Sequence, residues 1–144
     1  SISEELTKKL EADNFEDEEK SADAISLYEG IIAYKFKNED EITDETVKAK
    51  EQAAYRLANI FNNLAFEELI DLTKQILPAY ADLPKSKTAK IIRSMFDIAL
   101  RFPGRNRNDA LVGLSKYIID WCTTESRSFL RMKIENRLAD LLFK

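Results

Sequence analysis

The sequence predicts an all-α fold, a right-handed α-solenoid of about seven antiparallel helices. Apolar residues recur at helical spacing along nearly the whole chain. Three glycines and three prolines among 144 residues are too few for a strand-and-turn fold. Expected helix starts return about every 40 residues per helix pair, which is typical of tetratricopeptide/HEAT-like repeats. We therefore expect residues 1–144 to form a single solenoid domain with degenerate repeats.

The N-terminal part is predicted to hold three helices. The first covers about residues 3–13. The second opens at the acidic stretch 16–19, because acids are favoured at the positive N-terminal end of a helix, and it runs to about Phe36. Thr43 or Asp44 is expected to cap the third helix. The inward residues of the third helix are predicted to be Val47, Ala54, Leu57, Phe61 and Leu64.

Prolines mark the limits of the next two helices. The fourth helix should start near Ala65, and Pro78 should kink or end it, because proline removes a backbone donor. Pro84 suits the first residue of the fifth helix, where the missing N–H is not needed. The pair Pro103 and Gly104 should stop the fifth helix.

Two further helices complete the prediction. Asn106 or Asn108 is expected to cap the sixth helix, and Thr123 or Thr124 to start the seventh. The inward residues of the seventh are predicted to be Phe129, Leu130, Ile134, Leu138 and Leu141. The final residues, 138–144, are strongly apolar and carry no helix stop. Because a solenoid needs a polar cap at each end, we expect the natural chain to continue.

The net charge of −4 conceals an uneven distribution. Residues 1–50 hold 15 acids and 7 bases, whereas residues 51–144 hold 11 acids and 15 bases. A basic cluster lies within residues 85–107, where seven bases face one acid. An acidic protein partner is the predicted function of this cluster, and a set of solvated helix faces is the alternative. The candidate partner-binding residues are Lys85, Lys87, Lys90, Arg93, Arg105 and Arg107.

The composition argues against an enzyme, and we expect no catalytic residue, cofactor or metal site. The chain has no histidine, the commonest general base and metal ligand. Its one cysteine, Cys122, has no histidine to activate it. Adjacent acids such as Glu67 and Glu68 point about 100° apart on a helix, which suits surface residues. No apolar run approaches the ~20 residues of a membrane span, and an acidic protein without interleaved exposed aromatics is a poor nucleic-acid binder.

Two stretches resemble a known family. One is residues 74–95, KQILPAYADLPKSKTAKIIRSM, and the other is residues 119–131, IDWCTTESRSFLR, followed by ENRLA at 135–139. A weaker match is KEQ at 50–52. These stretches resemble the N-terminal solenoid of the non-ATPase regulatory subunit 11 family of the 26S proteasome lid. The resemblance extends from about residue 47 to 144, and the acidic first third departs from it.

The resemblance implies a non-catalytic scaffold in ubiquitin-dependent protein degradation, cytoplasmic and nuclear. In this family a right-handed solenoid precedes a PCI (winged-helix) domain, which would be absent from this chain. The solenoid would clamp the regulatory particle to the core cylinder, contacting a core α-type subunit and a proteasomal ATPase subunit. The PCI domain would join other lid subunits. The alternatives are a COP9 signalosome-like scaffold, a helical-repeat nucleic-acid-binding module and an enzyme that uses carboxylates alone.

Overall fold

The computed structural model describes residues 2–11, 18–101 and 105–143. The side chains of residues 10, 11, 18–21, 105 and 106 lie outside this description. The predicted stop at residues 103–104 and the start of the acidic stretch 16–19 also lie outside the described residues.

The described residues form seven α-helices and one short 3-10 helix, without a strand among them, and the all-α prediction is confirmed. The elements are α1 (Ile2–Glu11), α2 (Glu18–Ala33), η1 (Glu39–Glu41), α3 (Asp44–Leu64), α4 (Phe66–Ala79), α5 (Lys85–Ala99), α6 (Arg105–Thr124) and α7 (Ser128–Leu142).

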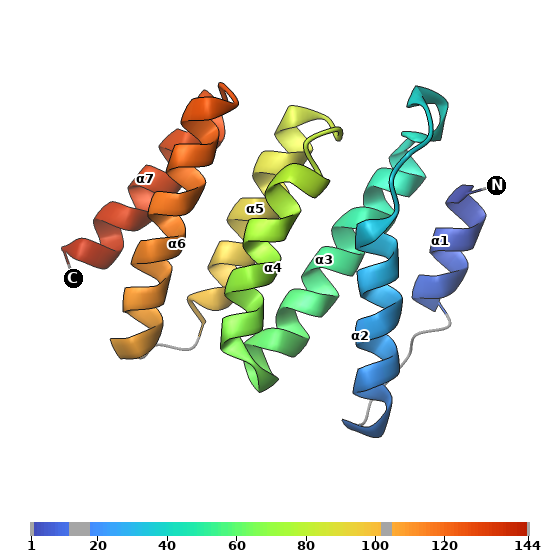
Figure 1. The fold of residues 1–144 in the computed structure, drawn as a ribbon, viewed down its shortest axis with the longest axis horizontal. Helices are drawn as coiled ribbons and strands as arrows, with labels where there is room; N and C mark the ends of the chain where they lie inside the picture. Colours follow the sequence, from blue (N-terminus) through green and yellow to red (C-terminus); the bar gives the residue numbers. More distant parts are fainter. Residues whose placement is uncertain (1, 12–17, 102–104, 144) are drawn as a thin grey trace.

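The helices stand in two layers (Figure 1). Helices α1, α3, α5 and α7 pack side by side in one layer, and α2, α4 and α6 form the other. Consecutive helices run in opposite directions, and the two ends of the chain lie at opposite ends of the array (Figure 1). This arrangement is consistent with an α-solenoid. The right-handed twist and the repeat length stay predictions.

Local sequence signals set several helix limits as expected. Thr43 caps α3 in a capping box: its hydroxyl accepts from the Thr46 N–H at 3.2 Å, and its own N–H donates to the Thr46 hydroxyl at 2.8 Å. Helix α4 ends at Ala79, one residue after Pro78. Pro84 lies just before α5, as its N-cap, rather than as its first helical residue.

The predicted starts of the sixth and seventh helices are wrong. Helix α6 begins at Arg105, so Asn106 and Asn108 lie inside it and do not cap it. Thr123 and Thr124 end α6 and do not start α7. Helix α7 starts later than predicted because a turn at Ser126 separates it from α6. The φ angle of Ser126 is 57°, a left-handed conformation that residues other than glycine seldom adopt.

This turn closes with the hydrogen bond of a Schellman motif. The Arg127 N–H donates to the Cys122 carbonyl at 2.8 Å, so α6 ends there and α7 begins at Ser128. A serine in the left-handed position was not recognisable as a helix stop, because glycine is the usual residue there.

The core lies between the two layers and contains most of the predicted inward residues. Leu57, Ile76, Ile92 and Phe96 are fully buried. Two predicted inward residues are corrected. Leu64, the last residue of α3, is 59% exposed, and Phe129, in the first turn of α7, is 54% exposed. Both lie at helix ends, where the opposite layer does not cover every residue of the apolar face.

Helix α2 ends at Ala33 and not at Phe36, and Lys50 supplies the reason. The buried Lys50 ammonium donates to the Ile32 carbonyl at 3.0 Å and to the Tyr34 carbonyl. These groups belong to the end of α2, where carbonyls lack helical partners. The Phe36 ring turns back over the ammonium, 5.3 Å away.

Candidate protein-interaction surface

The predicted basic residues do not form one cluster in the structure. Lys87, Lys90 and Arg93 lie on the side of α5 that meets α3. Lys85 lies at the start of α5 beside the turn between α6 and α7. Arg107 lies in the first turn of α6, against the junction of α3 and α4.

The side chain of Arg105 lies outside the described residues. The six residues are close in sequence, but those with described side chains lie in three different parts of the molecule. The partner contacts predicted for all six stay predictions.

The first of these places is built around Glu51 of α3. Its carboxylate is buried and accepts a hydrogen bond from the Tyr55 hydroxyl at 2.8 Å. The Lys90 ammonium lies 3.1 Å from it and the Lys87 ammonium 3.7 Å. Burial alone would raise the pKa of Glu51, but the bonds from Tyr55 and Lys90 and the nearby lysine charges outweigh it and lower that pKa. Glu51 thus holds two half-exposed lysines in place.

A groove of about 500 Å³ runs between α3 and α5 over this carboxylate. Lys48 of α3 lines the groove together with Lys87 and Lys90. Arg93 also lies close to Tyr55. Burial raises the pKa of Tyr55 to about 12, and the charge of Arg93 opposes that shift. We call Lys48, Lys87, Lys90 and Arg93 the α3–α5 basic face. Its four positive charges outnumber the two carboxylates that line the groove, those of Glu51 and Asp44.

Lys48 is a member of this face that sequence reasoning missed. It lies far from Lys87 along the chain, and only the packing of α3 beside α5 brings them together. A signal was present, since Lys48, Gln52 and Arg56 follow each other at intervals of four on one side of α3.

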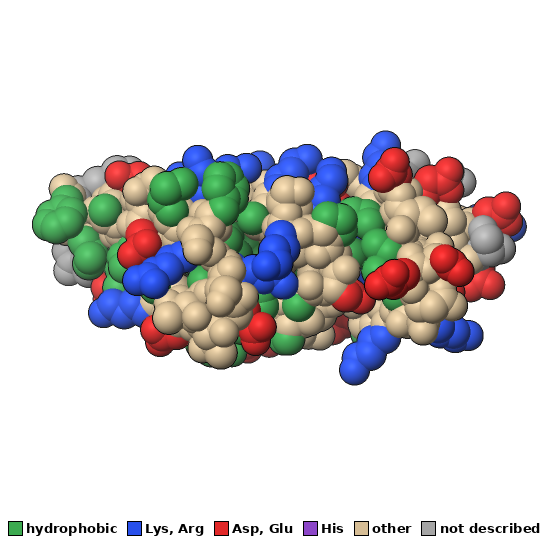
Figure 2. Space-filling model, turned by 90° about the horizontal axis from the view of Figure 1, so that it is seen from above, with side chains coloured by type: hydrophobic (Ala, Val, Ile, Leu, Met, Phe, Trp, Pro, Cys, Tyr) green, Lys and Arg blue, Asp and Glu red, His purple; other side chains and the backbone are tan. Residues whose placement is uncertain are grey.

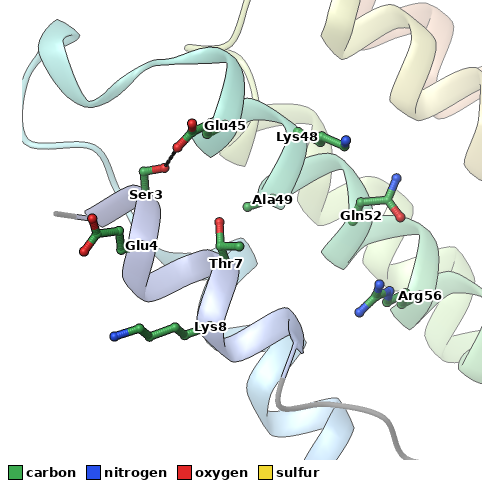
Figure 3. A pocket seen from close by; sticks show the side chains of 9 residues that line it. All are labelled: Ser3, Glu4, Thr7, Lys8, Glu45, Lys48, Ala49, Gln52 and Arg56. Carbon is green, nitrogen blue, oxygen red and sulfur yellow. Dashed lines mark hydrogen bonds between the residues drawn. The ribbon is translucent and has the colours of Figure 1, made fainter.

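A second groove lies on the other side of α3. Its volume is about 570 Å³, and its walls come from α1 and α3. Figure 3 shows Ser3 pointing across the groove to Glu45, to which its hydroxyl donates a hydrogen bond. Lys48 and Gln52 point away from α1 (Figure 3), and both also line the α3–α5 groove. The exposed side of α3 is therefore a ridge between two grooves.

Lys50, between Lys48 and Glu51 on α3, holds this ridge in place from beneath. The Tyr80 ring, in the turn after α4, lies 5.5 Å from its ammonium, and the Tyr80 hydroxyl donates to the Lys50 carbonyl at 2.7 Å. Burial lowers the pKa of Lys50 to about 8, with the charge of Asp82 opposing that shift. One side chain thus joins α2, α3 and the α4–α5 turn.

Arg107 has a structural role inside the molecule. Its guanidinium donates to the side-chain oxygen of Asn62 at 2.8 Å and to the Asn62 carbonyl at 3.0 Å. It also lies 4.2 Å from the centre of the Phe66 ring. Asn62 in turn donates to the Ile98 carbonyl at 3.0 Å. These contacts join the start of α6 to α3, α4 and α5.

Replacing Arg107 with alanine is expected to lower the free energy of unfolding by about 2 kcal/mol, because it leaves the buried Asn62 oxygens without donors and removes a cation–π contact. Urea denaturation followed by circular dichroism measures the change. Arg101→Ala is the matched control, since Arg101 is exposed and its guanidinium donates to the side-chain oxygen of Asn59, which is also exposed to solvent in part. Equal stabilities for the two variants would contradict the structural role.

Figure 2 shows how charge is distributed over one face of the molecule. Acidic side chains gather toward the end that carries α1, whereas lysine and arginine side chains are spread along the face, several of them over the middle (Figure 2). Apolar side chains are prominent at the end that carries α7 (Figure 2). The uneven charge of the sequence is therefore also an uneven charge in space.

The thiol of Cys122 is not activated as a nucleophile. Cys122 is buried, and burial raises the pKa of its thiol to about 11, so the reactive thiolate is scarce at neutral pH. Within residues 2–11, 18–101 and 105–143, no group of three or more acidic or cysteine side chains is placed to hold a metal ion. None of the helices in the described part of the chain is long and apolar enough to cross a membrane.

A family model for the 26S proteasome regulatory subunit RPN6 N-terminal domain matches residues 6–144. The chain belongs to this family. The match begins near the N-terminus, so the family likeness extends further into the acidic first third than the resemblance from residue 47 predicted. The proteasome resemblance is confirmed by this match.

Two curated relatives agree with the family. A 26S proteasome non-ATPase regulatory subunit 11 homolog of Arabidopsis thaliana is 33% identical over 128 residues, covering 88% of this chain and 29% of the relative. A Caenorhabditis elegans protein named Probable 26S proteasome regulatory subunit rpn-6.1 is 36% identical over 99 residues, covering 68% of this chain and 22% of the relative. The chain thus spans less than a third of their length. No solved structure matches the chain significantly.

Proposed function

We propose that the chain is the N-terminal solenoid of a proteasome regulatory-particle subunit and acts there as a non-catalytic scaffold, in the cytoplasm and nucleus. Family membership supports the assignment to the proteasome rather than to a COP9 signalosome-like complex. An elongated two-layer array suits a scaffold, because it presents long helix faces to partners.

The observation that carries the mechanism is the α3–α5 basic face. Lys48, Lys87 and Lys90 line the groove together with the buried Glu51 and with Asp44, and Arg93 lies nearby on α5. Glu51 orients Lys87 and Lys90, which reduces the entropy that a partner must remove when it binds. An acidic protein surface would gain charge complementarity and faster association from such a face.

The partner proposed for this face is a core α-type subunit, whose contact would clamp the regulatory particle to the core cylinder. A proteasomal ATPase subunit and other lid subunits are the further proposed partners. The α3–α5 basic face includes three of the predicted residues, Lys87, Lys90 and Arg93. Lys85 borders it across the first turn of α5.

The free side of α7 is proposed as the stacking surface for further helices of a longer chain that ends in a PCI domain. Met132 and Leu142 of α7 are exposed, and Phe143, just after the helix, is 87% exposed. Large exposed apolar side chains on a terminal helix favour association. The greater length of the relatives supports this proposal.

Combining Lys48→Glu with Lys90→Gln is expected to weaken binding to the purified proteasome core particle by at least about tenfold near physiological salt. The double variant removes two positive charges and adds a negative one, while Lys87 still neutralises Glu51. Biolayer interferometry at two salt concentrations measures the effect, and raised salt should weaken the wild type as well.

The matched control is Lys116→Glu, a charge reversal on an exposed lysine of α6 in the other layer. Equal affinity of the double variant and this control would remove the basic face from the docking model. Tighter binding to a random 20-nucleotide RNA than to the core particle would favour the nucleic-acid alternative.

A further inference from the structure

A third cavity, separate from the two grooves beside α3, lies between the starts of α5 and α7. Its volume is about 330 Å³. It is lined chiefly by Lys85, Ser86, Ala89, Arg127, Phe129 and Leu130. Both helices begin at the same edge of the array, where the α4–α5 and α6–α7 turns lie (Figure 1).

Contacts on either side hold the walls of this cavity. The Arg127 guanidinium donates to the Ala81 carbonyl at 3.1 Å, which joins the two turns, and it lies 5.3 Å from the Trp121 ring. Further along the same two helices, Arg137 donates to Asp97 at 2.9 Å. Helices α5 and α7 are thus tied together beyond the cavity and at its rim, so the cavity exists before any ligand arrives.

The lining combines an apolar surface with positive charge. Ala89, Phe129 and Leu130 supply the apolar part, and Phe129 is exposed by more than half. Lys85 and Arg127 supply cations, and none of the described residues that line the cavity carries a carboxylate. The Lys133 ammonium lies 5.4 Å from the Phe129 ring and adds a third positive charge nearby.

The first turns of α5 and α7 strengthen this potential. Neither helix has an acidic residue in its first turn, and neither has a side-chain cap. The positive end of each helix dipole therefore adds to the field of Lys85. By contrast, α3 and α4 both begin with two acids.

From this charge complementarity we infer that the cavity is a docking site for a short acidic peptide segment of a partner protein that carries one large apolar side chain. The apolar side chain would lie against Phe129 and Leu130, and a flanking carboxylate would pair with Lys85. The cavity lies between α5 and α7, inside the array, so helices stacked on the free side of α7 would not fill it. Binding here requires no proteasome component, and so its test is independent of the proposed function.

Fluorescence polarisation with a labelled nonapeptide tests this inference. The peptide has phenylalanine at its centre, two aspartates on each side, and a serine and a glycine at each end. We expect the chain to bind it at least about tenfold more tightly than the same peptide with serine at the centre, or with asparagine for aspartate. Amide shifts of residues 126–130 on titration would locate the peptide.

Two variants and a control complete the design. Lys85→Glu and Phe129→Ser should each weaken binding by at least about fivefold, and both residues are exposed, so folding should persist. Lys35→Glu, an exposed lysine after α2, should leave the affinity unchanged. The inference would be overturned if the acidic phenylalanine peptide does not bind, or if the two variants bind it as tightly as the wild type does. It would also be overturned if the wild-type chain is a dimer in solution and the Lys85→Glu variant is a monomer, because a second copy of the chain would then occupy the cavity.

Discussion

Replacing the buried Lys50 with alanine is expected to lower the free energy of unfolding by about 3 kcal/mol. The truncation would leave the Ile32 and Tyr34 carbonyls without their donor. It would also open a cavity among the rings of Tyr34, Phe36 and Tyr80, which lie 5.3 to 5.8 Å from the ammonium. Unsatisfied acceptors and a cavity both destabilise the folded state.

Urea denaturation measures this change, and Lys48→Ala is its matched control. Lys48 lies two residues away on the same helix and is exposed, so its loss should change stability by less than about 0.5 kcal/mol. A Lys50→Met variant restores volume without donors and should fall between the two. If Lys50→Ala and Lys48→Ala are equally stable, Lys50 does not join α2, α3 and the α4–α5 turn.

The stability of the wild type is expected to rise with pH, relative to Lys50→Met, as the pH increases above 8. Burial lowers the pKa of Lys50 to about 8 in the folded state, against 10.5 for an unperturbed lysine. Between these values the unfolded state binds more protons than the folded state, so stability increases with pH. The slope should approach about 1.4 kcal/mol per pH unit above pH 8, be about half of that near pH 8, and fade below about pH 7.

The other groups around Lys50 do not reverse this sign in the range tested. Burial raises the pKa of both Tyr34 and Tyr80, so neither hydroxyl ionises first in the folded state. Asp82 is common to both proteins, so its effect cancels in the comparison. Denaturation at about pH 7.5, 8.5 and 9.5 keeps below the titration of ordinary tyrosines. Parallel stability curves for the wild type and Lys50→Met would contradict a lowered pKa of Lys50.

The helices could be predicted because their signals are local. The Thr43 cap and the end of α4 after Pro78 depend on residues within one turn. The left-handed turn at Ser126 was missed, since serine rarely takes that conformation. The apolar pattern predicted that α2 continues through Tyr34 and Phe36. In the structure their rings lie close to the Lys50 ammonium, and α2 ends before them.

The candidate surface was predicted only in part, because it depends on contacts between distant residues. A run of bases on one stretch of sequence grouped Lys85 and Arg107 with Lys90, yet these side chains lie in three places. Lys48 belongs to the basic face, and Glu51 contacts its lysines, because α3 packs beside α5. Charge counts could not reveal that Arg107 is committed to Asn62 and Phe66.

The central claim is that the α3–α5 basic face docks the chain on the proteasome core. Cross-linking mass spectrometry of the chain with purified core particle, using a lysine-reactive reagent, tests it most directly. The account predicts cross-links from Lys48, Lys87 and Lys90 to an acidic part of one α-type subunit. In the Lys48→Glu and Lys90→Gln double variant, Lys87 is the lysine of the face that can still react, and its cross-links should be lost. Cross-links confined to Lys116 and other lysines of the opposite layer, unchanged in that variant, would contradict it.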